Sequence, residues 1–163
     1  MGILIKNSAN GLYTISDGIA LDDLMRAIMG ELRAQAVDGA VINDALTAKF
    51  YALNALKKEK EEAFYCIFLS QKNNILDHKI MFKGTVNQSC VHVRPIVRTA
   101  LELNAASLII AHNHPAGSSS PSREDIDMTR RLQSALNVFD IDLIDHIVVG
   151  DNCCSLKELG INF

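Results

Sequence analysis

The chain has 163 residues, of which 48% are hydrophobic and 21% are charged. This composition allows a sizeable core and excludes global disorder, and the length fits one domain with a small appendage. A net charge of −3 and a pI near 5.9 give no support to a strongly basic surface of the kind that binds nucleic acid without specificity, although a local basic patch is compatible with them.

Cysteine usage and hydropathy bear on location. The four cysteines are Cys66, Cys90, Cys153 and Cys154, and none of them forms a C-x-x-C pair. This pattern favours reduced thiols in a cytosolic protein. No apolar run approaches the ~20 residues of a membrane span, and the first residues lack the apolar core of a signal peptide. We therefore expect a cytoplasmic protein without membrane contact.

The first 58 residues predict an N-terminal helical extension. A short strand is expected at residues 11–15, and apolar residues then recur at helical spacing from about 21 to 36. Asn43 is a suitable N-cap for a second helix that reaches about residue 56. Each helix has one apolar side, so pairing with a second copy, as a homo-oligomer, is open.

Residues 59–163 alternate strand and helix patterns. Residues 63–69, AFYCIFL, are almost wholly apolar and predict a strand buried on both faces. The later elements are expected as a strand at 75–82, a helix at 91–103, a strand at 107–111, a helix from 122 to 138, and strands at 141–149 and 153–156. This order predicts an α/β fold, with a mixed sheet on which helices pack.

One stretch, AHNHPAGSSSPSREDID, gathers metal-capable side chains. His112 and His114 lie two residues apart at a strand end, so their side chains point to the same face. Asp125 falls in the first turn of the following helix, which can return to that strand end. Two imidazoles and one carboxylate leave one position open on a tetrahedral Zn²⁺, as in catalytic sites. The pattern therefore predicts one catalytic zinc ion.

Hydrolysis at such a centre needs further groups. A general acid/base must move a proton from water to the leaving group, and a donor should face the developing oxyanion. Ser122, three residues before Asp125, is a candidate for this donor and also for the N-cap of the helix. Both roles stay open. For the histidines, the simpler alternative is a polar turn that satisfies local backbone groups.

The same residues resemble a known family. HNHPAGSSSPSRED matches the JAMM metalloprotease signature H-x-H-x(7)-S-x-x-D, and residues 62–160 resemble the RadC-like branch of the MPN (JAB) superfamily. The resemblance implies an MPN/JAB-like mixed β-sheet flanked by helices over residues 59–163. It implies zinc bound by His112, His114 and Asp125, with Ser122 stabilising the oxyanion. The family's general base precedes an early core strand, which here implies Glu62, with Glu61 as the neighbouring alternative.

Two functions follow as expectations. The first is a JAMM-type zinc metallopeptidase that cleaves peptide or isopeptide bonds in a protein or peptide substrate. The alternative is a RadC-type accessory module in DNA repair or DNA metabolism without proteolytic activity. The acidic pI argues against the alternative, and we find no glycine hairpin of the helix-hairpin-helix region that longer RadC proteins carry. The residues that favour it are local basic ones: Arg94, Arg98, Arg123, Arg130 and Arg131.

Overall fold

The computed structural model describes residues 4–6, 13–15, 40–84 and 92–163. Their contacts divide the chain into two units, Met1–Ala40 and Val41–Phe163. In the first unit, β1 (Leu4–Lys6) pairs antiparallel with β2 (Tyr13–Ile15). The strand expected at residues 11–15 therefore includes β2, whereas β1 was not predicted. The helix expected at 21–36 lies outside the described residues.

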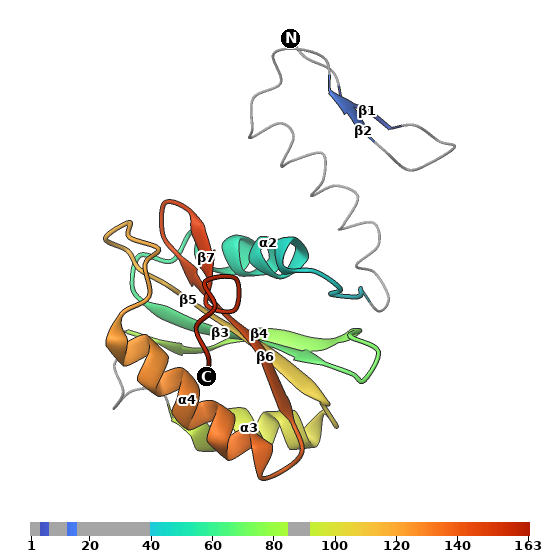
Figure 1. Cartoon of the computed structure of the whole chain (residues 1–163), viewed down its shortest axis with the longest axis vertical. Coiled ribbons are helices and arrows are strands. Elements are labelled where there is room, and N and C mark those ends of the chain that lie inside the picture. Colours follow the sequence, from blue (N-terminus) through green and yellow to red (C-terminus); the bar gives the residue numbers. More distant parts are fainter. Residues whose placement is uncertain (1–3, 7–12, 16–39, 85–91) are drawn as a thin grey trace. The chain divides into compact units, whose positions relative to one another are not determined.

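The second unit is built on a mixed sheet with the strand order β4-β3-β5-β6-β7 (Figure 1). The strands are β3 (Ala63–Leu69), β4 (Ile75–Lys83), β5 (Ser107–Asn113), β6 (Asp142–Val149) and β7 (Cys153–Ser155). The pair β5–β6 is parallel, and the other neighbours are antiparallel. The helices are α2 (Ala45–Leu56), α3 (Val93–Glu102) and α4 (Arg123–Asn137). The predicted fold class, a mixed sheet flanked by helices, is confirmed.

Helices cover both faces of this sheet. α2 lies on one face, and α3 and α4 lie on the other (Figure 1). Successive strand side chains alternate between the two layers, so Phe64 and Ile110 face α3 and α4, whereas Tyr65 and Ile109 face α2. All residues of β3 and β5 are consequently buried, which is why these two strands are apolar with few exceptions.

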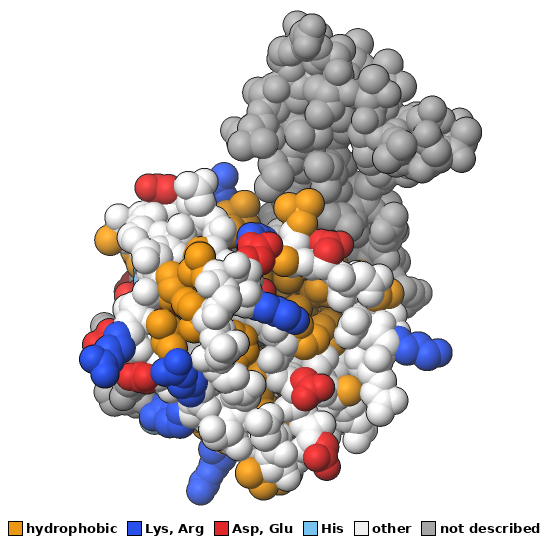
Figure 2. All heavy atoms as spheres, viewed as in Figure 1, with side chains coloured by type: hydrophobic (Ala, Val, Ile, Leu, Met, Phe, Trp, Pro, Cys, Tyr) orange, Lys and Arg blue, Asp and Glu red, His pale blue; other side chains and the backbone are white. Residues whose placement is uncertain are grey.

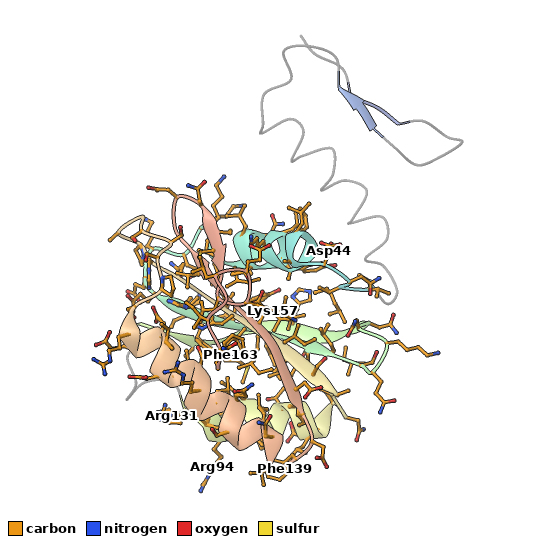
Figure 3. All side chains as sticks on the ribbon, in the orientation of Figure 1. Asp44, Arg94, Arg131, Phe139, Lys157 and Phe163 are labelled. Atoms are coloured by element: carbon orange, nitrogen blue, oxygen red, sulfur yellow. The ribbon has the colours of Figure 1, made fainter. Side chains whose placement is uncertain are left out.

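The structure places α2 with the sheet. The residue pattern assigns this helix to an extension ending at residue 58, but α2 buries Ala48, Ala52 and Leu56 in the core on one face of the sheet. Contacts accordingly group it with Val41–Phe163. Its N-cap is Asp44, labelled in Figure 3, rather than the expected Asn43. The Asp44 carboxylate accepts the N–H of Thr47 at 2.7 Å.

The family resemblance requires β3, which follows Glu62, to lie beside β5, which carries His112, and the two strands are neighbours. β3 runs antiparallel beside β5, and Phe64 pairs with His112.

In the part of the chain that the structure describes, Cys66, Cys153 and Cys154 are free thiols. Burial raises the pKa of each of these thiols. No helix in the described ranges is long and apolar enough to span a bilayer.

Candidate metal centre

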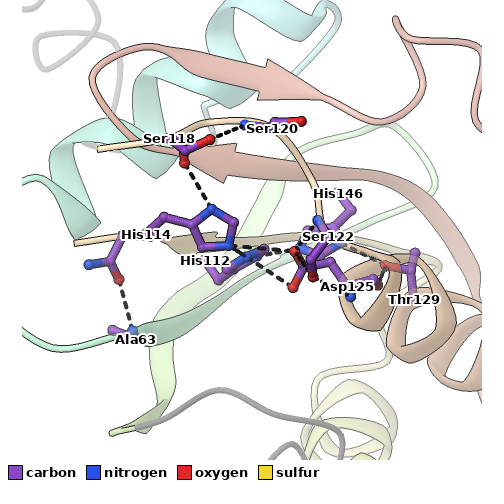
Figure 4. A network of polar contacts seen from close by, with 10 residues as sticks. Ala63, His112, His114, Ser118, Ser120, Ser122, Asp125, Thr129 and His146 are labelled. Atoms are coloured by element: carbon purple, nitrogen blue, oxygen red, sulfur yellow. Dashed lines mark hydrogen bonds and ion pairs between the residues drawn. The ribbon is translucent and has the colours of Figure 1, made fainter. Parts of the chain in front are cut away.

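Three predicted ligands come together where β5 meets the start of α4. β5 carries His112 near its carboxyl end, and His114 follows directly after the last residue of the strand. α4 begins after Ser122 with a capping box, which places Asp125 in the first turn. Because α4 packs on the sheet through Met128, Leu132 and Leu136, its first turn lies against the two histidines (Figure 4).

The distances suit a shared ion. His112 Nε2 lies 3.2 Å from Asp125 Oδ1 and 2.9 Å from His114 Nε2, and His114 Nε2 lies 3.5 Å from Asp125 Oδ2. A tetrahedral zinc with bonds of about 2.0–2.1 Å separates its ligand atoms by about 3.3 Å. The three side chains each offer one ligand atom, all within 4.8 Å of one another. The group can therefore hold a metal ion.

The protonation of His114 supports a cation at this point. Its Nδ1 lies 2.8 Å from the carbonyl oxygen of Ser118. A carbonyl only accepts hydrogen bonds, so Nδ1 carries a proton, and in the tautomer with that single proton the lone pair of Nε2 points toward the group. The carboxylate of Asp125 also only accepts. Acceptors that converge at these distances repel one another unless a proton or a metal ion lies between them.

Asp125 is held as an anion. Burial alone would raise the pKa of this carboxyl group, but the adjacent His112 ring and the hydrogen bonds from Ser122 hold it well below its usual value. The backbone N–H and the hydroxyl of Ser122 donate to Asp125 Oδ2 at 2.7 and 2.6 Å, and the N–H of Asp125 returns a bond to Ser122 Oγ at 3.1 Å. The predicted N-cap role of Ser122 is confirmed.

His146 adjoins this centre, which the sequence did not predict. It lies in β6 and is fully buried. Its Nε2 is 2.8 Å from His112 Nδ1, and its Nδ1 is 2.6 Å from Thr129 Oγ1. Burial, with His112 nearby, lowers the pKa of His146 well below its ordinary value. His146 is therefore a neutral imidazole near pH 7.

Asn113 fixes the chain segment that carries Glu62. Its Oδ1 accepts the N–H of Ala63 at 2.8 Å, and its Nδ2 donates to the carbonyl oxygen of Glu61 at 3.1 Å. Phe64 pairs with His112, and two further residues of the same antiparallel register would set Glu62 opposite His114. Glu62 is half-buried, whereas Glu61 is exposed. If the alternation of β3 continues to residue 62, it would direct Glu62 rather than Glu61 to the side of the sheet that bears the histidines.

Several other polar residues lie on the surface. His92 is exposed and stacks edge-on against Phe82, with ring centroids 6.2 Å apart. Arg94 and Arg131 project outward from α3 and α4 (Figure 3). On the face drawn in Figure 2, Lys and Arg side chains have Asp and Glu side chains among them, and Arg130 pairs with Asp127 at 3.7 Å.

A mixed sheet with helices on both faces, and a His-His-Asp group at the end of a central strand, defines an α/β domain with a metal-competent centre. The chain belongs to the RadC-like JAB domain family, which matches residues 42–161. This confirms the resemblance that the motif carried.

Relatives agree with that membership. A UPF0758 protein of Pseudomonas syringae pv. tomato is 46% identical over 125 residues, covering 76% of this chain and 55% of the relative. A UPF0758 protein of Vibrio vulnificus is 46% identical, covering 72% and 54%. One of Thioalkalivibrio sulfidiphilus is 39% identical, covering 95% and 69%. The chain thus spans about half the length of the first two and somewhat more of the third.

Proposed function

We propose that this domain is a zinc-dependent hydrolase of the JAMM type that cleaves peptide or isopeptide bonds in protein or peptide substrates. The observation that carries the proposal is the convergence of His112, His114 and Asp125 as three acceptors within 3.5 Å of one another. Two imidazoles and one carboxylate are a donor set suited to zinc, with a position left for substrate. When bound, zinc supplies Lewis acidity and a water nucleophile near neutral pH.

Glu62 is the general base in this proposal. It takes one proton from the attacking water and gives it to the nitrogen that leaves, as the new C–O bond forms and the C–N bond breaks. The register that sets Glu62 opposite His114 supports this assignment over Glu61. A positioned acid/base of this kind contributes about 10²–10⁴ in rate.

Ser122 has two roles in the proposal. Its hydroxyl donates to Asp125 Oδ2 and so orients the carboxylate. To stabilise an oxyanion, the same hydroxyl must turn from Asp125 toward the substrate oxygen, since it has one hydrogen to donate. Loss of this hydroxyl therefore affects both the orientation of the Asp125 carboxylate and the stabilisation of the oxyanion. A substitution of Ser122 is for this reason a less specific test of catalysis than a substitution of Glu62.

The first test is metal content. Purified protein stripped with chelator is titrated with zinc, and bound metal is counted by mass spectrometry. We expect one zinc per chain in the wild type and none in His114→Ala or Asp125→Asn. His78→Ala, an exposed histidine on β4, is the matched control and should bind like the wild type. A wild type without zinc, or zinc retained in His114→Ala, would overturn the proposal.

The second test is hydrolysis. Zinc-loaded protein is incubated with a fluorogenic peptide library and with lysine-isopeptide-linked conjugates. Glu62→Gln should retain zinc and lose about 10²–10⁴ in rate, whereas Glu61→Gln should stay active. Activity that survives Glu62→Gln removes this residue from the mechanism. Absence of hydrolysis, together with submicromolar DNA binding that weakens steeply with salt, would favour the accessory-module alternative.

A further inference from the structure

A buried chain of hydrogen bonds leads from α4 to the first metal ligand. The Thr129 hydroxyl lies 2.6 Å from the carbonyl oxygen of Asp125 and 2.6 Å from His146 Nδ1. The other ring nitrogen of His146, Nε2, lies 2.8 Å from His112 Nδ1. Thr129 and His146 are fully buried and His112 is 1% exposed, so water does not compete for these bonds (Figure 4).

The direction of each bond follows from donor chemistry. A carbonyl oxygen only accepts, so the single hydroxyl hydrogen of Thr129 goes to Asp125. Thr129 Oγ1 must then accept from His146, which places the ring proton of His146 on Nδ1. A neutral imidazole carries one proton, so His146 Nε2 is an acceptor. His112 Nδ1 therefore donates to it, and His112 Nε2 is left without a proton.

This direction matters because His112 Nε2 is the atom that faces Asp125 and His114. We propose that Thr129 and His146 are positioning residues that fix the His112 tautomer, so that its Nε2 lone pair is presented to the metal before the metal arrives. The inference rests on the metal site of the proposed function. It adds that the affinity of that site is set partly by a threonine on α4 that does not face the ion.

The opposite outcome can be imposed by substitution. Without the Thr129 hydroxyl, His146 Nδ1 has no acceptor at that position, and the ring gains by moving its proton to Nε2. His146 then donates to His112 Nδ1, and the proton of His112 moves to Nε2, where it blocks the metal. Partners of this kind around a metal ligand typically change metal affinity by about 10–100-fold.

The test compares matched variants by zinc affinity, measured in competition with a chromophoric chelator. Thr129→Val should bind zinc about 10–100-fold more weakly than the wild type, and Thr129→Ser, which restores the hydroxyl, should bind like the wild type. His146→Leu should weaken binding similarly. His146→Gln should retain affinity, because its amide can donate to Thr129 and accept from His112.

A second readout does not depend on zinc. Nitrogen-15 spectra of the imidazoles in the metal-free protein should show His112 protonated on Nδ1 in the wild type and shifted toward Nε2–H in Thr129→Val. Wild-type affinity in Thr129→Val, or a wild-type His112 protonated on Nε2, would overturn the inference. A wild type that binds no zinc fails the proposed function instead, and the spectra still decide the tautomer.

Discussion

Replacement of Asn113 by alanine should lower the free energy of unfolding, although Asn113 is the last residue of β5. Asn113 is 5% exposed, and its amide bridges β5 to the segment before β3. The variant leaves the buried N–H of Ala63 without its partner, which costs about 1–3 kcal/mol. It also removes the bond to the carbonyl oxygen of Glu61, which contributes about 0.5–1.5 kcal/mol, less where water can replace it. We expect a total loss of about 1.5–4.5 kcal/mol.

Urea denaturation of the metal-free protein at pH 7 measures this loss. Asn137→Ala is the control, because Asn137 is an exposed residue at the end of α4 and such substitutions change stability by about 0.5 kcal/mol or less. Hydrogen exchange at the Ala63 amide should accelerate in Asn113→Ala alone. A variant within about 0.5 kcal/mol of the wild type, with Ala63 still protected, would refute the reasoning.

Three further predictions concern the centre itself. Ser122→Ala should lose about 0.5–2 kcal/mol in urea denaturation through its cap, whereas Ser134→Ala, an exposed serine on the same helix, should change little. Zinc at ~100 times its dissociation constant should stabilise the protein by ~2.7 kcal/mol, and a melting temperature unmoved by zinc in the wild type, or moved equally in His114→Ala, would contradict this. The pKa values of Asp125 and His146 are lower in the folded protein than in the unfolded chain, so the unfolded chain binds more protons at acidic pH. The stability of the metal-free protein should therefore fall as the pH drops below about 6.5, through His146, and again below about 4, through Asp125. When the urea midpoint is measured across pH, the decrease near pH 4 should be absent in Asp125→Asn, and the decrease near pH 6.5 should be absent in His146→Gln.

Local pattern predicted the parts of the fold that depend on local composition. The strand at 63–69 was predicted with its observed limits, because burial on both faces makes the whole segment apolar. The strand expected to end at residue 111 continues to Asn113, because His112 and Asn113 pair with Val148 and Val149 on β6. Because Val148 and Val149 lie far along the chain, the sequence around the histidines does not indicate this pairing.

In the metal centre, too, only the part that depends on nearby residues could be predicted from the sequence. The spacing of His112, His114 and Asp125 predicted a metal group, because the strand end and the helix start that carry them are joined by one loop. His146 is 34 residues from His112, and its place depends on the parallel register that pairs it with Ile110, after an irregularity between Leu108 and Ile109. A local pattern cannot fix such a register, so the sequence alone does not place His146 beside His112.

Proximity in sequence and proximity in the hydrogen-bond network therefore make opposite predictions for zinc affinity. Asn113 lies between two ligands in the chain, but its side chain bonds toward Glu61 and Ala63 and not toward the metal group. Thr129 lies four residues past Asp125 and reaches His112 only through His146. Asn113→Ala should therefore lose stability but keep wild-type zinc affinity, and Thr129→Val should lose affinity. If Asn113→Ala binds zinc as weakly as Thr129→Val, the affinity depends on general order at the strand end, and the separate role of the Thr129–His146 chain is refuted.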